Sequence, residues 1–257
     1  MRRNLTGLRV IVTGASSGIG RALVLELLEA GAYVLALARR PDRLEKLASE
    51  AHSDHLLTLA GDVTDGAVRR AALERCQSAW GGCDALVNNA GIGGLGLFTS
   101  ADEARLRRIM EVNFFAPAEF IRQSLPLLRS GRQPLVVNVG SVLGHRAVPN
   151  KSEYSASKFA LHGLTDALRA ELGREGIGVL LVSPSTTQSE FFDQALGDSA
   201  TPRSQRGAMS APQVARKIVA AMRTGKHEII LSAGGRLLVW LDRLCPPLAN
   251  WLVARHG

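Results

Sequence analysis

The chain has 257 residues, of which 46% are hydrophobic and 21% charged, a composition that fits one globular domain and excludes a disordered protein. Its net charge of +8 favours acidic partners such as phosphates. Aromatic residues make up only 5% and no basic run is interleaved with them, so nucleic-acid binding is not expected. The cysteines, Cys76, Cys83 and Cys245, are scattered and fit no disulfide or zinc motif, so we expect a cytoplasmic protein without a metal site. The apolar run at residues 10–12 is too short for a signal peptide.

The first motif is a glycine-rich loop. Residues 8–12 predict a buried strand, the sequence TGASSGIG follows at 13–20, and a helix is expected over 21–30. Glycines at this spacing allow a tight strand-to-helix turn and a close approach of backbone to a ligand. The free N–H groups of the next helix favour phosphate, although such a loop can also be a turn without ligand. The candidate contacts to a dinucleotide are Gly14, Ser16, Ser17, Gly18, Ile19 and Gly20.

A second strand, predicted over 33–38, ends at Ala38 and is followed by Arg39 and Arg40. In dinucleotide-binding sheets an acidic residue at this position suits a free ribose 2′-hydroxyl, whereas arginine accommodates a 2′-phosphate. Ala38 leaves no acidic residue at the strand end and Arg39 supplies a planar cation that suits phosphate, so the sequence favours NADP over NAD. The alternative is that the two arginines only open a solvated loop before the helix expected over 42–51.

Polar residues follow the next predicted strands, at 56–60, 85–87 and 135–139, where parallel sheets bind ligands. After the first comes Asp62, which either accepts from an adenine amino group or caps a helix starting near residue 65. After the second comes the run Asn88–Gly91, and Ser141 follows the third. A helix expected from about residue 101 carries Asn113 on an apolar face, where its amide needs partners.

The region from Ser152 to Leu172 predicts a helix with Ser152 as N-cap and Gly173 as its stop. Tyr154 and Lys158 are four residues apart, so they share one helix face. A nearby ammonium lowers the pKa of a tyrosine toward the range that acid–base catalysis needs, although a surface pair without coupling also fits. The positions predicted to form the buried stripe are Ala156, Ala160, Leu164, Ala167 and Leu168.

In this order and at these separations, the motifs resemble the short-chain dehydrogenase/reductase family over nearly the whole chain. The resemblance implies a single catalytic domain over 1–257 with a doubly wound Rossmann-type α/β fold, in which helices cover both faces of one parallel sheet of about seven strands. It also implies an oxidoreductase that transfers hydride between NADP(H) and a ketone or secondary alcohol.

The resemblance assigns the catalytic roles to four residues. Tyr154 is the general acid or base, and Lys158 lowers its pKa and binds the nicotinamide ribose. Ser141 donates to the substrate oxygen, and Asn113 holds a water near Lys158. The further cofactor contacts that it implies are Arg39, Arg40, Asp62, Val63, Asn89, Ala90, Gly91, Pro184, Thr186 and Thr187.

One segment departs from the family pattern. After the strand predicted over 179–183, Ser185 replaces the usual glycine, and Thr187 and Ser189 stand where the family has valine and threonine. This departure motivates a second hypothesis, an NADP(H)-binding regulatory or scaffold protein with little turnover. Residues 190–210 resemble a substrate lid, in which Phe191, Phe192 and Leu196 either line an apolar pocket or anchor the lid.

After a helix over 212–224 and a strand over 228–231, the chain ends in an apolar tail at about 235–257. Leu237, Leu241, Leu244 and Leu248 step by three and four, which gives one apolar face. The tail can pack on its own domain, cover another subunit of a homodimer or homotetramer, or contact a membrane peripherally. We expect protein, from the same subunit or another one, to cover the tail.

Overall fold

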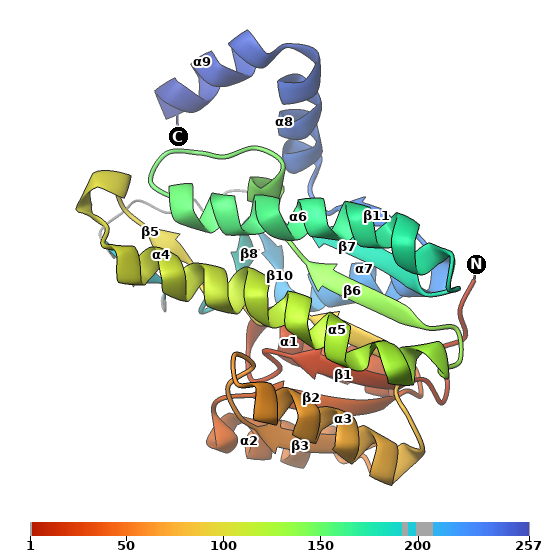
Figure 1. Ribbon diagram of the computed structural model, residues 1–257. Helices are drawn as coiled ribbons and strands as arrows, with labels where there is room; N and C mark the ends of the chain where they lie inside the picture. Colours follow the sequence, from red (N-terminus) through yellow and green to blue (C-terminus); the bar gives the residue numbers. More distant parts are fainter. Residues whose placement is uncertain (1, 192–194, 199–207, 257) are drawn as a thin grey trace.

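A seven-stranded parallel sheet forms the centre of the molecule in a computed structural model, which describes residues 2–191, 195–198 and 208–256 (Figure 1). The strand order is β3-β2-β1-β4-β6-β7-β11. The strands are β1 (Arg9–Thr13), β2 (Tyr33–Ala38), β3 (Leu56–Ala60), β4 (Ala85–Asn88), β6 (Leu135–Val139), β7 (Gly178–Ser183) and β11 (Glu228–Ile230). The predicted strands therefore form as expected, with ends that differ by one residue at most.

Helices cover both faces of the sheet, as the doubly wound prediction requires (Figure 1). One apolar core lies between the sheet and α1, α2 and α7, and a second core lies between the opposite face and α3, α5 and α6. The continuous apolar sequences of the central strands are explained by burial on both faces. The helices are α1 (Gly18–Glu29), α2 (Pro41–Ala51), α3 (Gly66–Trp80), α4 (Glu103–Met110), α5 (Ala116–Arg129), α6 (Ser152–Gly173), α7 (Ala211–Thr224), α8 (Ala233–Leu244) and α9 (Pro246–His256).

A buried carboxylate ties the amino ends of the central strands together. Asp84, which is 0% exposed, accepts hydrogen bonds from Arg9 Nε at 2.8 Å and from the backbone N–H of Arg132 at 2.6 Å. The Arg9 guanidinium makes a second bond to the same carboxylate at 2.6 Å. Because a buried charge is stable only with such partners, this pair fixes the start of β1 beside β4.

The buried face of α6 differs from the predicted one. Ala156 and Ala167 are exposed, and Ala160, Leu164 and Leu168 are only partly buried. The buried positions instead include the polar residues Glu153, Tyr154, Ser155, Ser157, Lys158 and Thr165. The polar face turns inward because its groups find partners inside: Thr165, for example, accepts from the amide of Asn138. Ser152 is also the first helical residue rather than the N-cap, which is Lys151, and Gly173 is the last.

The helix predicted from residue 101 begins at Glu103, where the side chain of Asp102 accepts from the N–H of Arg105. It runs into one π-helical turn, η2 (Glu111–Phe115), and continues as α5. Such turns occur often at functional sites because they shift the side chains of the helix around its axis. Asn113 lies within this turn.

The lid and the tail complete the chain. In the described part of the lid, β9 (Leu196–Gly197) pairs with β5 (Gly94–Leu95), and β10 (Met209–Ser210) pairs with β8 (Thr187–Gln188); Phe192 lies outside the described residues. The tail helices α8 and α9 project beyond α6, away from the central sheet (Figure 1). Among the described residues, no helix has the length and hydropathy needed to cross a bilayer.

Candidate active site

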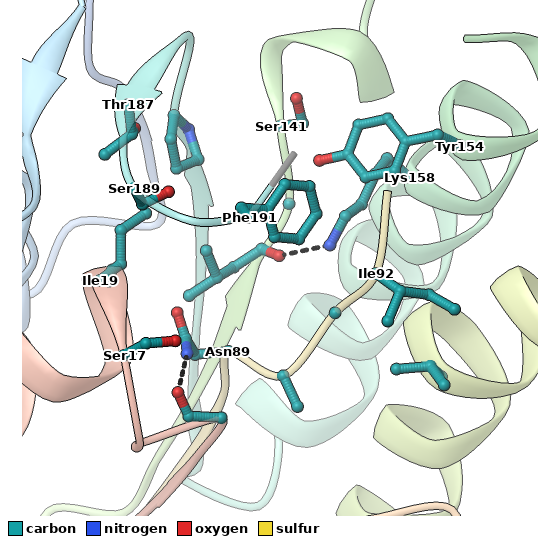
Figure 2. A pocket seen from close by; sticks show the side chains of 18 of the residues that line it. Ser17, Ile19, Asn89, Ile92, Ser141, Tyr154, Lys158, Thr187, Ser189 and Phe191 are labelled. Atoms are coloured by element: carbon teal, nitrogen blue, oxygen red, sulfur yellow. Dashed lines mark hydrogen bonds between the residues drawn. The ribbon is translucent and has the colours of Figure 1, made fainter. Parts of the chain in front are cut away.

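A cavity of about 420 Å³ lies at the carboxyl ends of the central strands (Figure 2). Its walls come from the glycine-rich loop, the ends of β2, β4, β6 and β7, and the helices α6 and α8. The predicted site residues that line it are Gly14, Ser16, Ser17, Gly18, Ile19, Arg39, Arg40, Asp62, Val63, Asn89, Ala90, Gly91, Ser141, Tyr154, Lys158, Pro184, Thr186 and Thr187. The fold thus brings together residues that are up to 173 positions apart, from Gly14 to Thr187.

The glycine-rich loop packs too tightly for any side chain at two of its glycines. A Cβ on Gly20 would lie 2.3 Å from the carbonyl oxygen of Gly14, and one on Gly14 would lie 2.8 Å from the Cα of Ala90. The amide of Asn89 donates to the carbonyl of Thr13 at 2.8 Å and holds the two loops together. This tight turn leads directly into α1, whose N-terminal N–H groups suit a phosphate, so the residues present fit a dinucleotide.

The two arginines after β2 differ in their contacts. Arg40 donates to the hydroxyl of Ser16 at 3.2 Å and to that of Ser17 at 2.8 Å, which holds its guanidinium against the glycine-rich loop. Arg39 is exposed at the rim of the cavity. Arg40 is therefore the stronger candidate for a ligand phosphate.

Asp62 does not cap α3, because the side chain of Asp65 accepts from the N–H of Ala67 and takes that role. Asp62 accepts instead from the N–H and hydroxyl of Thr64, at 2.9 and 2.8 Å, and from Arg108 at 2.9 Å. These bonds hold its carboxylate at the cavity wall.

The catalytic candidates Ser141, Tyr154 and Lys158 meet at one end of the cavity (Figure 2). The Tyr154 side chain is buried and its hydroxyl is hydrogen-bonded to that of Ser141. Burial raises the pKa of Tyr154 to about 12, and the bond from Ser141 opposes this increase. Burial also lowers the pKa of Lys158 to about 8.

The predicted pKa lowering of Tyr154 by Lys158 is absent from this arrangement of the described residues. The ammonium of Lys158 donates to the carbonyl of Val139 at 3.0 Å and lies 5.8 Å from the centre of the Tyr154 ring. Desolvation of the phenol therefore outweighs the distant positive charge.

The side chain of Asn113 is hydrogen-bonded within the protein, and the water near Lys158 that the resemblance implies stays a prediction. It is fully buried, its amide donates to the carbonyl of Ile92 and to the hydroxyl of Ser157, and its oxygen accepts from the N–H of Ile92, each at 2.9 Å. Asn113 thus connects the loop after β4 to Ser157 of α6, the residue before Lys158. These bonds position the loop and the helix relative to each other.

The substitution of the family's glycine by Ser185 leaves the backbone unstrained. The non-glycine residues with positive φ in the described chain are His52, Gln133 and Asn150, so Ser185 adopts a conformation open to any residue. The segment is also held in place, since the carbonyl of Pro184 accepts from the N–H of Val142 at 2.9 Å.

His145, which follows β6, and His162 of α6 lie close to Glu228 of β11. The potential ligand atoms of His145, His162 and Glu228 lie within 4.8 Å of one another, an arrangement that sequence spacing did not indicate. However, both ring nitrogens of His162 face oxygen acceptors, the carbonyl of Gly144 at 3.1 Å and the carboxylate of Asp166 at 3.3 Å. His162 thus makes a hydrogen-bonded contact between α6 and the loop after β6.

Comparison with known proteins identifies the family. Residues 9–199 match the model of the short chain dehydrogenase family. The chain belongs to this family of oxidoreductases. The chain is 32% identical to dehydrogenase/reductase SDR family member 7B of Bos taurus, and the alignment covers all of this chain and 83% of the relative. It is 30% identical to 11-beta-hydroxysteroid dehydrogenase A of Sesamum indicum, with 97% of this chain and 75% of the relative covered. A short-chain dehydrogenase/reductase from Burkholderia phymatum in complex with NAD has the same fold, with a TM-score of 0.88, 24% identity and 96% of each chain covered.

The sequence missed, or left open, several residues that line the cavity or contact its walls. Leu238 of α8 lines the cavity, and Phe191, for which two roles were left open, also lines it. Arg43, in the first turn of α2, binds the lid residue Glu190 beside Arg40. Arg43 has no local signal, because an arginine in a polar helix is normally solvated.

Proposed function

We propose that the protein is an NADP(H)-dependent oxidoreductase that acts on a ketone or secondary alcohol. The observation that carries this proposal is the convergence of Ser141, Tyr154 and Lys158 on the cavity that the glycine-rich loop and Arg40 also line. The bound cofactor supplies or accepts the hydride. A protein that only binds nucleotide has no use for a hydrogen-bonded pair of hydroxyl groups and a buried lysine beside that ligand.

The roles of the protein groups follow from their chemistry. Tyr154, a neutral phenol, donates its proton to the carbonyl oxygen, and Ser141 bonds the same oxygen and orients it. Lys158, whose ammonium lies 5.8 Å from the centre of the phenol ring, would bind the cofactor ribose. Asn113 fixes the distance between α6 and the loop after β4. Apolar side chains at this end of the cavity, from Ile92, Val142, Leu143 and Leu238, favour a substrate with an apolar body.

The decisive experiment follows NADPH oxidation against a broad panel of carbonyl compounds, and NADP⁺ reduction against the matching alcohols. We expect turnover with at least one apolar ketone. No turnover with any member of the panel, in spite of tight NADPH binding, would favour the regulatory or scaffold protein instead.

Cofactor preference has its own test. Arg40 should contribute about 1.5–3 kcal/mol to NADPH binding through charge-assisted bonds to the 2′-phosphate. Arg40→Ser should therefore weaken NADPH binding far more than NADH binding, whereas Arg39→Ser, the matched control at the exposed neighbour, should have a smaller effect. Equal dissociation constants of the parent protein for NADPH and NADH would contradict the NADP assignment.

We also propose a cytoplasmic homo-oligomer in which a second copy of the chain covers the tail. Leu237, Trp240, Leu244, Leu248 and Trp251 form an exposed apolar face on α8 and α9, on which Trp240 is 56% and Leu244 77% exposed. A face of this kind is unfavourable in water. The double variant Trp240→Glu/Leu244→Glu should dissociate the oligomer in analytical ultracentrifugation. A monomeric parent that sediments with anionic liposomes would show instead that a membrane covers the tail.

A further inference from the structure

A carboxylate of the chain itself binds the arginines at the proposed 2′-phosphate position. Arg43 Nη1 donates to the two oxygens of Glu190 at 2.8 and 3.0 Å, and Arg40 Nη1 donates to Oε2 at 3.4 Å. The other nitrogens of the Arg40 guanidinium bond Ser16 and Ser17 of the glycine-rich loop. Glu190 is thus an anion held at the junction of β2, α2 and the glycine-rich loop.

Two guanidinium groups that converge on one carboxylate form a site that suits phosphate equally well. Arginine presents several N–H donors in a plane, a geometry that matches both carboxylate and phosphate oxygens. The bond from Arg43, its charge and that of Arg40 hold the pKa of Glu190 below its ordinary value, so this group is an anion at neutral pH. The site therefore binds an anion that the chain itself supplies.

The residues on either side of Glu190 also lie in the cavity. Ser189 lies against the glycine-rich loop, where a Cβ on Gly18 would be 3.2 Å from its Cβ. The ring of Phe191 packs edge-on against Tyr154 with ring centres 5.8 Å apart, and Figure 2 shows it in the middle of the cavity. A Cβ on Gly91 would lie 3.7 Å from this ring and 3.6 Å from Nζ of Lys158. The segment Ser189–Phe191 therefore extends from the phosphate-binding loop to the catalytic lysine.

We propose that Glu190 is an internal competitor for the 2′-phosphate of NADP(H), and that Arg43 is a second arginine of that phosphate site. The inference rests on the proposed function, since it requires NADP(H) to bind at Arg40. A 2′-phosphate bound there displaces Glu190 and takes over its bonds to Arg40 and Arg43. Glu190 thereby weakens NADP(H) binding and sets how readily the cofactor exchanges.

The size of the competition follows from the exposure of the ion pairs. The Glu190 side chain is 45% exposed and that of Arg43 is 39% exposed, so water and salt screen much of the attraction. Glu190→Gln keeps the shape of the side chain and removes its charge. We expect this variant to bind a 2′-phosphate roughly 3- to 10-fold more tightly, an effect that should shrink as salt is added.

The test uses two nucleotide fragments and one matched control. The dissociation constants of 2′,5′-ADP, which carries the 2′-phosphate, and of 5′-ADP, which lacks it, are measured by calorimetry for the parent, Glu190→Gln and Glu45→Gln. Glu45 lies on α2, two residues from Arg43, and is exposed, so its variant removes the same charge from the same neighbourhood. Only Glu190→Gln should tighten 2′,5′-ADP binding, and 5′-ADP binding should change less than about twofold.

Three outcomes would overturn the inference. These are unchanged or weaker binding of 2′,5′-ADP to Glu190→Gln, equal tightening by Glu45→Gln, and equal tightening of both fragments by Glu190→Gln. The NADP assignment fails separately, when the parent binds NADPH and NADH equally. For Arg43, Arg43→Gln should weaken 2′,5′-ADP binding and leave 5′-ADP binding unchanged; an equal loss for both fragments would remove Arg43 from the phosphate site.

Discussion

Replacement of Tyr154 by phenylalanine is the most direct test of the catalytic assignment. The Tyr154 side chain is buried, with only 5% of the residue exposed, and phenylalanine keeps the ring while it removes the hydroxyl that bonds Ser141. Packing against Phe191 and the position of α6 should therefore persist. Since only one hydrogen bond is lost, the free energy of unfolding should change by about 1 kcal/mol at most.

The expected loss of activity is much larger than the loss of stability. Proton transfer by a positioned side chain contributes roughly 10²- to 10⁴-fold to the rate, which corresponds to about 2.7–5.4 kcal/mol of activation free energy. Tyr154 and Ser141 bond to each other and would both bond the substrate oxygen, so they should act as a unit. The double variant Ser141→Ala/Tyr154→Phe should then be nearly as active as Tyr154→Phe alone.

The assay measures kcat/KM with NADPH and the best ketone of the panel, together with NADPH binding by fluorescence. Tyr33→Phe is the matched control, because Tyr33 is the other tyrosine of the chain. It lies on β2, packs against His55 and Trp80, and does not line the cavity. It should keep full activity. A Tyr154→Phe enzyme that binds NADPH and retains more than about a tenth of the parent's kcat/KM would refute Tyr154 as the proton donor.

Three further variants test the surroundings of the site. Burial lowers the pKa of Lys158 from 10.5 to about 8. Between these pH values the native state binds fewer protons than the unfolded chain, so the free energy of unfolding that this group contributes rises with pH. Urea titrations from pH 8 to 10 should show that Lys158→Met flattens this increase. Asp84→Asn leaves the Arg9 guanidinium without its buried charge partner and should lower the free energy of unfolding by about 3 kcal/mol. A variant whose urea midpoint equals that of the parent would contradict the role given to this ion pair. Gly20→Ala places a methyl group 2.3 Å from the Gly14 carbonyl, so it should cost about 1–3 kcal/mol and abolish tight NADPH binding; normal binding would show that the turn can widen.

The sheet and the ligand-binding loops were predictable because their signals are local. The strand at 33–38, for example, needs only a continuous apolar run. The glycine-rich loop needs glycines at positions such as 14 and 20, where no side chain fits. The carboxyl ends of parallel strands then meet at one edge, which brings the residues that follow these strands together. Nearly all of the predicted residues that line the cavity could therefore be identified from local sequence patterns, without knowledge of any long-range contact.

The buried face of α6 could not be predicted from periodicity. The stripe that begins with Ala156 is apolar and regular, yet the helix buries Tyr154, Ser157 and Lys158. What decides the orientation is the set of partners on other elements, such as Val139 for Lys158. A hydrophobic pattern contains no information on such partners, so it favours the wrong face wherever a functional site is buried.

The role of Arg40 and Arg43 was only partly predictable for a similar reason. The sequence favoured Arg39, the first of two adjacent arginines after β2, as the residue that suits the phosphate, whereas the contacts in the structure favour Arg40. The structure distinguishes them through Ser16 and Ser17, which bind Arg40, and it adds Arg43 through Glu190, which is 147 residues away in the chain.

The pKa values of Tyr154 and Lys158 bear on how the proton is transferred in the proposed reaction. At neutral pH, Tyr154 with a pKa of about 12 is a neutral phenol, which is the form that protonates a carbonyl oxygen. Abstraction of a proton from an alcohol needs the phenolate instead, and burial disfavours that anion unless a positive charge comes closer. Lys158 is held at 5.8 Å from the ring by its bond to Val139, so the phenolate gains little from it in this arrangement. Donation of the proton in the proposed reduction leaves the same phenolate, so the cost of this buried anion applies to both directions. We therefore expect Lys158 to leave Val139 and approach the phenol oxygen during proton transfer in either direction.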